Sequence, residues 1–107
     1  MKIQITADLL DGIVLAILEN DDRYGYELTQ SIQKVIAVSE STMYPVLRRL
    51  KKNGYLTTYD QPYQGRNRRY YQITDDGRNY LEDIRKLWEN YKNGIDQTLG
   101  AGREDKK

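Results

Sequence analysis

Cationic side chains recur at helical spacing in one short segment of the chain. Arg48, Arg49 and Lys52 precede Asn53 and Gly54, a pair that commonly ends a helix. The spacing of Arg48 and Lys52 places both on one helix face. Guanidinium and ammonium groups bind phosphate oxygens, and arginine also pairs with the edge of guanine. Such a face suits double-stranded DNA, and an ordinary solvated helix face is the simpler alternative.

A second cationic group follows, between two stretches rich in Tyr and Thr or Ile. Tyr55–Tyr59 and Arg69–Ile73 have strand composition. The loop between them, Asp60–Asn67, is longer than a two-residue hairpin turn, so we expect an extended wing. Its tip carries three polar residues that should reach the DNA backbone or a neighbouring groove: Arg66, Asn67 and Arg68. Arg69 falls on the opposite strand face from Arg68, so one of these two arginines is expected to serve the fold.

The charge distribution separates this segment from the rest of the chain. The 107 residues are 38% hydrophobic with a net charge of +1, which suits one compact domain with a small core. Residues 44–73 contain seven Lys or Arg and one acid, giving +6, whereas the remainder contains ten and fifteen, giving −5. This asymmetry is typical of a protein with one positive face.

The composition also limits the chemistry. The chain has no Cys and no His, which excludes disulfides, thiolate zinc sites and imidazole catalysis. We therefore expect no metal site and no cofactor. Asp8 and Asp11 interrupt the first apolar stretch, which resembles neither a signal peptide nor a membrane span. A cytoplasmic protein without a membrane partner is expected.

Two helices are expected ahead of the basic segment. The first spans roughly residues 6–19, with Thr6 or Asp8 as its N-cap. Asp22 is expected to cap the second helix, whose apolar residues form one buried line: Leu28, Ile32 and Val35. A short strand stub is expected at residues 37–38.

The third helix is expected to carry the cationic face and to run to Asn53. Three hydroxyl residues offer N-caps for it: Ser39, Ser41 and Thr42. A start at Ser41 or Thr42 is favoured, because Pro45 then falls in the first turn, where its missing N–H costs nothing. A cap at Ser39 would require a kink. Met43, Leu47 and Leu50 should face the core. Ser41, Thr42 and Tyr44 are expected to bond phosphates or bases, with capping and packing as their alternative roles.

A long fourth helix is expected over residues 75–99, capped by Thr74. It would be about 37 Å long, which is more than a three-helix domain of this size can cover. Its apolar residues repeat at the intervals typical of paired helices: Leu81, Ile84, Trp88, Tyr91 and Ile95, with Leu87 beside them. A second copy of the chain is the simplest partner, so these six residues are the expected dimer interface.

Four segments, in order, resemble the PadR family of bacterial transcriptional regulators: Tyr24–Leu28, Ser41–Leu50, Gly54–Leu56 and Gly65–Thr74. The resemblance covers nearly the whole chain. It implies a mainly α fold with a small β-hairpin. A winged helix-turn-helix would occupy residues 1–74, followed by a dimerisation helix over 75–99 and a disordered tail over 100–107. It also implies a homodimeric repressor that binds an inverted-repeat operator in double-stranded DNA and is released by a small aromatic effector.

In one branch of that family, a Trp of the last helix stacks on a planar drug at the dimer interface. Trp88 is the single Trp and falls at the matching place, with Tyr91 one turn on. Both are therefore expected effector-binding residues, with packing alone as the alternative. Asp83 and Glu89 are acids that a cationic ligand would find nearby.

Two other classes of function fit the sequence less well. The carboxylate pairs Asp21-Asp22 and Asp75-Asp76 each have a capping role and no basic or nucleophilic companion, so an enzyme is not expected. A winged helix that contacts only another protein is the stronger rival. The basic helix and wing argue against it, whereas failure to bind any duplex DNA would favour it.

Overall fold

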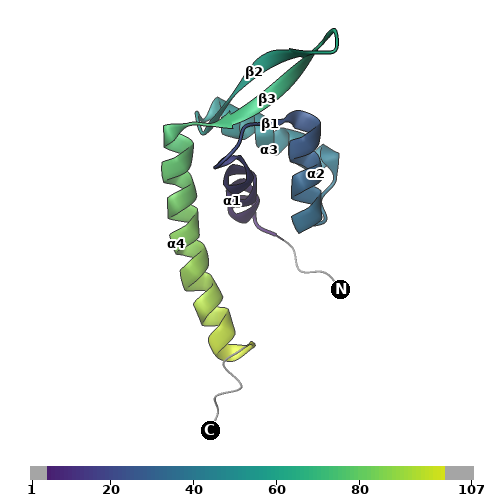
Figure 1. The fold of residues 1–107 in the computed structure, drawn as a ribbon. Helices are drawn as coiled ribbons and strands as arrows, with labels where there is room; N and C mark the ends of the chain where they lie inside the picture. The colour runs from purple at the N-terminus through teal and green to yellow at the C-terminus, as the bar shows by residue number, and fades with distance from the viewer. Residues whose placement is uncertain (1–4, 101–107) are drawn as a thin grey trace.

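The computed structural model describes residues 5–100, which form four helices and a three-stranded antiparallel sheet (Figure 1). The elements are α1 (Ala7–Leu18), β1 (Arg23–Tyr24), α2 (Gly25–Val35), α3 (Glu40–Lys52), β2 (Leu56–Tyr63), β3 (Arg66–Ile73) and α4 (Asp75–Thr98). The expected mainly α fold, a winged helix-turn-helix followed by one long helix, is confirmed. Of the tail expected over residues 100–107, residues 101–107 lie outside the described part.

The core forms where the first three helices meet the base of the sheet and the start of α4. Thr6 caps α1 by accepting a hydrogen bond from the Leu9 amide at 3.2 Å. The buried apolar residues come from every element except β1: Leu10, Val14, Leu15, Leu18, Leu28, Ile32, Met43, Leu47, Leu50, Leu56, Ile73 and Leu81. Because this core includes the inner side of α3, the opposite side of that helix is left facing solvent.

The start of α2 differs from the prediction. Asp22 does not cap it, because Arg23 and Tyr24 form a strand that pairs with β3, and the helix begins afterwards at Gly25. The Asp22 carboxylate instead accepts hydrogen bonds from the Tyr59 hydroxyl at 2.6 Å and from the Gln72 side-chain amide at 3.2 Å. The first of these bonds raises the pKa of Tyr59 to about 12.

The end of α2 and the connection to α3 also differ. Leu28 and Ile32 are buried as expected, but Val35 is 64% exposed at the last turn of the helix. Residues 37–38 form no strand. The third strand of the sheet is β1 instead, which adds to the outer edge of β3 and completes the order β1-β3-β2.

Helix α3 begins one to two residues earlier than the favoured start. Ser39 is its N-cap, with its hydroxyl accepting from the Thr42 amide at 3.3 Å. Pro45 therefore lies inside the helix, so the Ser41 carbonyl lacks its usual intrahelical donor. Gly54 ends the helix with φ of +84°, as the sequence predicts, because an L side chain rarely adopts that conformation.

The wing is a regular hairpin, and the prediction of a long loop at its tip was wrong. Strands β2 and β3 pair as far as Tyr63 and Arg66, leaving a two-residue turn at Gln64 and Gly65. Both turn residues have positive φ, 50° and 79°, as the tightest hairpin turns require. Pro62 is tolerated because β2 is an edge strand of the sheet.

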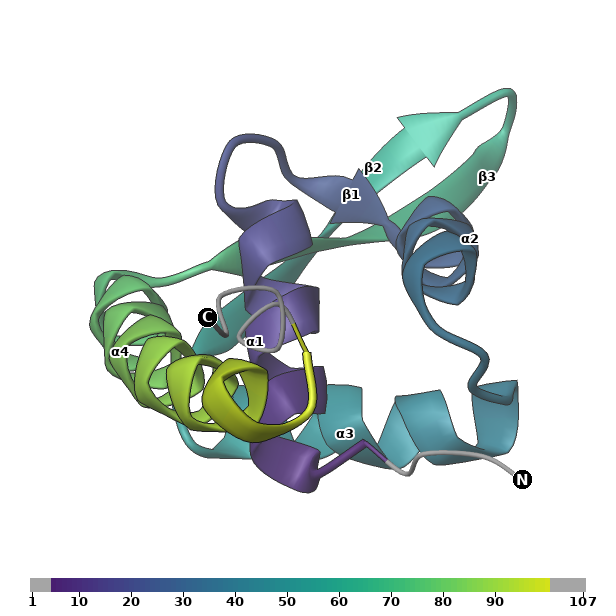
Figure 2. The same ribbon diagram turned by 90° about the horizontal axis from the view of Figure 1, so that it is seen from below.

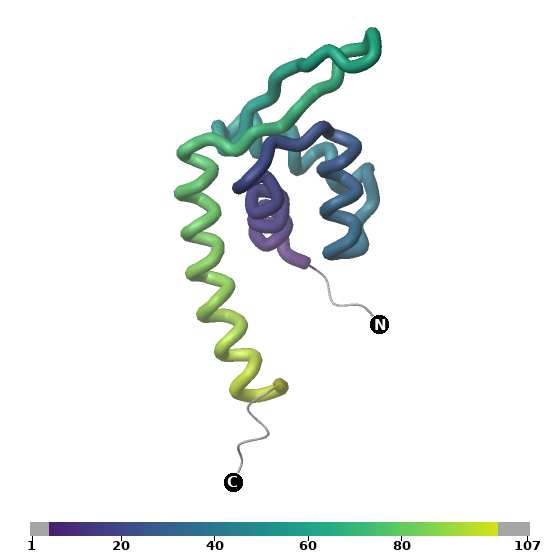
Figure 3. Tube along the Cα trace, in the orientation of Figure 1, coloured from purple at the N-terminus to yellow at the C-terminus, as the bar shows by residue number. Residues whose placement is uncertain are grey.

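Helix α4 leaves the sheet and passes along α1 (Figures 1 and 3). Thr74 caps it as predicted, accepting from the Gly77 amide at 2.9 Å. Gly77 in this first turn has no room for a side chain, since a Cβ atom there would lie 2.0 Å from the Tyr55 carbonyl oxygen. Only a glycine lets the first turn of α4 approach the chain at the end of α3 this closely.

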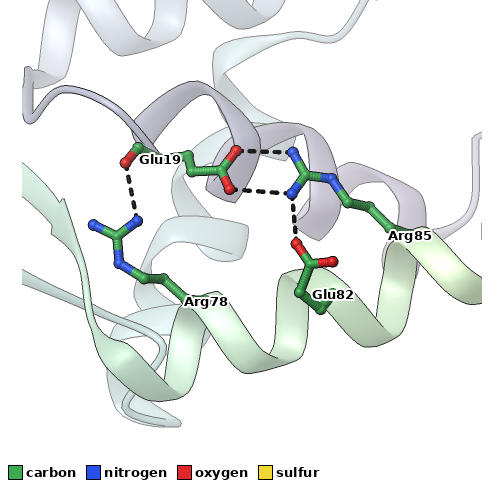
Figure 4. Close-up of polar contacts among 4 residues, drawn as sticks. All are labelled: Glu19, Arg78, Glu82 and Arg85. Carbon is green, nitrogen blue, oxygen red and sulfur yellow. Dashed lines mark hydrogen bonds and ion pairs between the residues drawn. The ribbon is translucent and has the colours of Figure 1, made fainter.

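Polar contacts also tie α4 to the end of α1 (Figure 4). Arg78 donates to the Glu19 carbonyl at 3.0 Å and thereby caps the C-terminus of α1. Arg85 donates two hydrogen bonds to the Glu19 carboxylate, at 3.1 and 2.8 Å, and one to Glu82 at 2.7 Å. None of the helices within residues 5–100 combines the length and apolar character that a membrane span needs.

Candidate nucleic-acid interface

The outer face of α3 presents the predicted polar and cationic residues together. Met43, Leu47 and Leu50 are buried on its inner side. The residues expected to contact DNA are all exposed on this helix: Ser41, Thr42, Tyr44, Arg48, Arg49 and Lys52. The helix thus combines a fixed inner side with a free outer side that carries hydroxyl, phenol and cationic groups.

Three hydroxyl groups cluster at the N-terminus of α3. The Ser39 hydroxyl lies 2.9 Å from that of Ser41 and donates to that of Thr42 at 3.2 Å. All three residues are exposed. A helix N-terminus with exposed hydroxyls favours phosphate oxygens. Thr42 is engaged in this capping cluster, which was the alternative role expected for it, and Ser39 joins the candidate surface.

The wing arginines have different surroundings. Arg66 and Asn67 are exposed next to the turn. The Arg68 guanidinium lies between two rings, 4.1 Å from the centroid of Tyr24 and 3.6 Å from that of Tyr63. Stacking of this kind holds a guanidinium in place while its N–H groups stay free to bind phosphate.

Arg69 is a wing cation that the predicted site omits. Its Nε atom lies 3.4 Å from Asp60 on the paired strand, and both side chains are at least half exposed. An exposed pair of this kind is weak, so Arg69 remains available for a stronger anion. Strand alternation puts Arg69 and Asn67 on the side of β3 that carries Tyr71, which packs against the core. Burial raises the pKa of Tyr71.

Arg49 is the one predicted contact residue whose guanidinium already has a strong partner. It donates to both carboxylate oxygens of Asp11, at 3.1 and 2.6 Å. Asp11 is 1% exposed, and its second donor is the Tyr80 hydroxyl at 2.8 Å. The hydrogen bond to Asp11 raises the pKa of Arg49, while burial and the bond to Asp11 raise the pKa of Tyr80. An acid interrupting the apolar stripe of the first helix was the sequence signal for this pair.

The wing and α3 belong to one side of the molecule. Seen along α4, the tip of the hairpin and the N-terminal end of α3 both project to the right, with α2 between them (Figure 2). The same elements lie to the right of α4 in the first view (Figure 1). Helix α4 lies on the other side of the molecule (Figure 1).

The stripe on α4 divides into two parts. Leu81 and Ile84 are 2% and 5% exposed, so both are already covered by the protomer itself. Four of the six predicted interface residues remain at least 38% exposed: Leu87, Trp88, Tyr91 and Ile95. Leu99 continues this stripe at 71% exposure. The apolar surface that needs a partner therefore lies on the C-terminal half of α4.

A groove of about 1070 Å³ lies between this half of α4 and the start of α1. Its walls are mainly apolar and include Leu9, Ile13, Trp88, Tyr91, Ile95 and Leu99. The ring centroids of Trp88 and Tyr91 are 6.3 Å apart and their planes are tilted by 43°. The acid that lines the groove is Asp96, and not Asp83 or Glu89 as expected from the sequence.

The three-helix arrangement with a two-stranded wing and an exposed basic third helix defines a winged helix-turn-helix protein. Residues 14–83 match the family described as the transcriptional regulator PadR-like family. The chain belongs to this family, whose members are transcriptional regulators and not enzymes. PadR regulators bind DNA and typically dimerise.

Individual relatives agree with the family match. A crystal structure of a Streptococcus mutans protein is 42% identical, covers 94% of this chain and 95% of its own, and superposes with a TM-score of 0.84. A PadR family transcription regulator from Clostridium difficile is 31% identical over 85% and 98% of the two chains, with a TM-score of 0.78. A transcriptional regulator of Mycobacterium tuberculosis is 35% identical over 71 residues, 65% of this chain and 66% of its own.

Proposed function

We propose that the protein is a homodimeric repressor that acts in the cytoplasm and binds an inverted-repeat operator through α3 and the wing. The observation that carries the proposal is the cationic outer face of α3 and a cationic hairpin on the same side of the molecule, in a chain whose other residues are net acidic. The exposed residues of α3 enter the major groove, and the hairpin follows the backbone toward the neighbouring groove.

The residues of α3 and of the wing have separate roles in this proposal. Arg48 and Lys52 supply charge to phosphates and base edges, and Tyr44 lies beside them. The hydroxyls of Ser39 and Ser41 bind a phosphate at the helix N-terminus. On the wing, Arg66 and Asn67 are free at the turn, and stacked Arg68 provides a cation of fixed position. Thr42 contributes through the cap, which sets the direction of the first turn.

The second copy packs on the C-terminal half of α4. The support is the exposed apolar stripe from Leu87 to Leu99 and its continuity with the groove beside α1. An exposed apolar stripe that continues into an apolar groove is typical of an interaction site on a small protein. A two-fold dimer presents two α3 helices in opposite directions, so its operator is an inverted repeat with half-sites set by the dimer geometry.

A planar aromatic effector occupies the groove in this proposal. Trp88 is 40% exposed and lines it together with Tyr91, so a flat ring has an aromatic surface to stack on. Asp96 lies in the wall together with the cations Arg85 and Lys92, so the charges of the wall do not select a cationic ring over an anionic one. The effector releases the operator if it binds better to a dimer whose two α3 helices are wrongly spaced for DNA.

Selection from a random duplex pool tests the proposed function and needs no operator sequence to begin with. The full chain is expected to enrich an inverted repeat, and footprinting should show two protected half-sites separated by whole turns of about 10 base pairs. Affinity should fall steeply with salt. If the chain enriches no sequence and binds no duplex at low salt, the proposal is wrong, and a winged helix that contacts only proteins is favoured.

A further inference from the structure

A single buried carboxylate joins three helices. Asp11 lies on α1 with 1% of its surface exposed. Arg49 reaches it from α3 through two hydrogen bonds of 3.1 and 2.6 Å, and Tyr80 reaches it from α4 through one of 2.8 Å. A carboxylate buried among apolar residues is stable only when its oxygens are fully paired, so these three side chains depend on one another.

The Arg49 guanidinium fits the Asp11 carboxylate more closely than another cationic side chain would. The two terminal nitrogens of Arg49 bind separate oxygens of Asp11, an arrangement that needs the planar fork of a guanidinium. Lysine would supply the charge without the fork. Arg49 uses these nitrogens toward the interior of the protein, whereas Arg48, its neighbour on the outer face, has no partner among residues 5–100.

Tyr80 has a second link to α3. Its ring stacks on that of Tyr55, with centroids 4.2 Å apart and planes 17° from parallel. Tyr55 lies beyond Asn53 and Gly54, which end α3, and its backbone amide donates to the Leu50 carbonyl at 2.9 Å. Tyr80 on α4 is thus linked to α3 in two ways. Its ring stacks on Tyr55 just past the end of that helix, and its hydroxyl shares Asp11 with Arg49 in the last turn of α3.

We propose that Asp11, Arg49 and Tyr80 form a clamp that fixes α3 relative to α4, and that Arg49 acts in DNA recognition as a positioning residue and not as a DNA contact. This inference rests on the proposed function, because it concerns how the DNA-reading helix is held. The clamp also connects the groove with α3 through a single helix, α4. The C-terminal half of α4 lines the groove, and Tyr80, nearer the start of the same helix, holds the clamp.

Tyr80→Phe tests the clamp because Tyr80 is directed into the protein and its ring stays stacked in the variant. Tyr55→Phe is the matched control, since it removes a hydroxyl from the other ring of the same stack, and that hydroxyl bonds no residue that the structure describes. Two measurements are made on full-length protein: affinity for the selected duplex and a random duplex, and amide hydrogen exchange of α3 without DNA.

Tyr80→Phe is expected to weaken binding to the selected duplex by up to about fivefold, because the free energy of one hydrogen bond limits how far its loss can shift α3 from the DNA-binding position. Binding to the random duplex and the salt dependence should not change, because every cation is retained. Exchange of the α3 amides should accelerate in Tyr80→Phe and not in Tyr55→Phe. In an Arg49→Lys background, Tyr80→Phe should have a smaller effect, because the two changes act on one carboxylate.

Equal DNA affinity and equal α3 exchange in Tyr80→Phe and Tyr55→Phe would overturn the clamp. A full effect of Tyr80→Phe in the Arg49→Lys background would overturn the part assigned to Arg49. If the wild-type protein bound no duplex, the proposed function would fail instead. The exchange of the α3 amides would then still decide whether the clamp holds this helix.

Discussion

Gly12 of α1 lies so close to Ile84 of α4 that a Cβ atom on Gly12 would be 2.8 Å from the Ile84 Cγ2 atom. Both residues are buried. The first half of α4 is therefore packed on α1 as part of the winged-helix core, through Gly12 and the Arg85 contacts with Glu19. The second half extends past this contact with its apolar side exposed.

Gly12→Ala is expected to lower the free energy of unfolding by about 1–2 kcal/mol, since overpacking against Ile84 outweighs the better helix propensity of alanine. Gly94→Ala is the matched control on α4, where a Cβ atom would meet nothing within 4 Å. It should raise the free energy of unfolding by about 0.5–1 kcal/mol. Urea denaturation at one fixed protein concentration measures both. Equal gains in the two variants would show that the Gly12 contact is not tight.

Ile95→Glu is expected to break the dimer. It places a charge on the exposed half of the stripe, where burial of an unpaired carboxylate costs about 3–5 kcal/mol. Sedimentation should show about twice 12.6 kDa for the wild type and a monomer or aggregate for the variant. Gln97→Glu adds the same charge to α4 outside the groove lining and should remain a dimer. Ile84→Glu would be uninformative, because Ile84 is already buried in the protomer. A wild-type monomer at micromolar concentration would refute the dimer.

Planar cationic dyes are expected to quench the fluorescence of Trp88, the single Trp of the chain. Offset stacking adds roughly 0.5–1.5 kcal/mol per ring pair beyond area burial, and a cationic ring gains more over indole than over phenol. Trp88→Ala should weaken dye binding, measured by dye anisotropy, and leave DNA affinity nearly unchanged. Loss of the dimer in Trp88→Ala, or no response to any dye, would assign Trp88 to packing alone.

The contact between Glu19 and Arg85 predicts a pH dependence of stability. The hydrogen bonds from Arg85 hold the pKa of Glu19 below its ordinary value of 4.5. The folded state therefore binds this proton less readily than the unfolded state. The contribution is fully present above about pH 4.5 and is lost as the pH falls through the lowered pKa. The stability difference between wild type and Glu19→Gln should shrink over that acid range. Arg85→Gln should remove this pH-dependent difference. A difference that is constant with pH would contradict the assignment.

The sequence predicts those elements whose signals are local. The caps at Thr6 and Thr74, the buried side of α3 and the end of that helix at Gly54 all follow from neighbouring residues. The tight hairpin turn does not, because the outer halves of β2 and β3 are exposed on both faces. Such strands show no alternation of apolar and polar residues to reveal where they end.

Other features depend on partners that are distant in sequence. In the sequence, Arg49 cannot be distinguished from its neighbour Arg48, because its partner Asp11 lies 38 residues away along the chain. Asp22 was predicted to cap α2, but strand pairing places Tyr59 beside it, and its carboxylate accepts a hydrogen bond from the Tyr59 hydroxyl instead. The need for Gly77 arises only from the approach of Tyr55. In each case the tertiary contact decides the role, and no periodicity along the chain indicates it.

The salt dependence of duplex binding tests whether α3 is the DNA-reading helix. For the wild-type protein on its selected duplex, the logarithm of the affinity should fall linearly with the logarithm of salt concentration. Arg48→Ala with Lys52→Ala should make that slope shallower by about 0.9 for each phosphate that the variant no longer neutralises. Neither residue belongs to the core, so the variant should unfold like the wild type. Lys86→Ala, an exposed cation on α4, should leave the slope unchanged. Wild-type affinity and slope in the double variant would contradict the assignment of α3 as the DNA-reading helix.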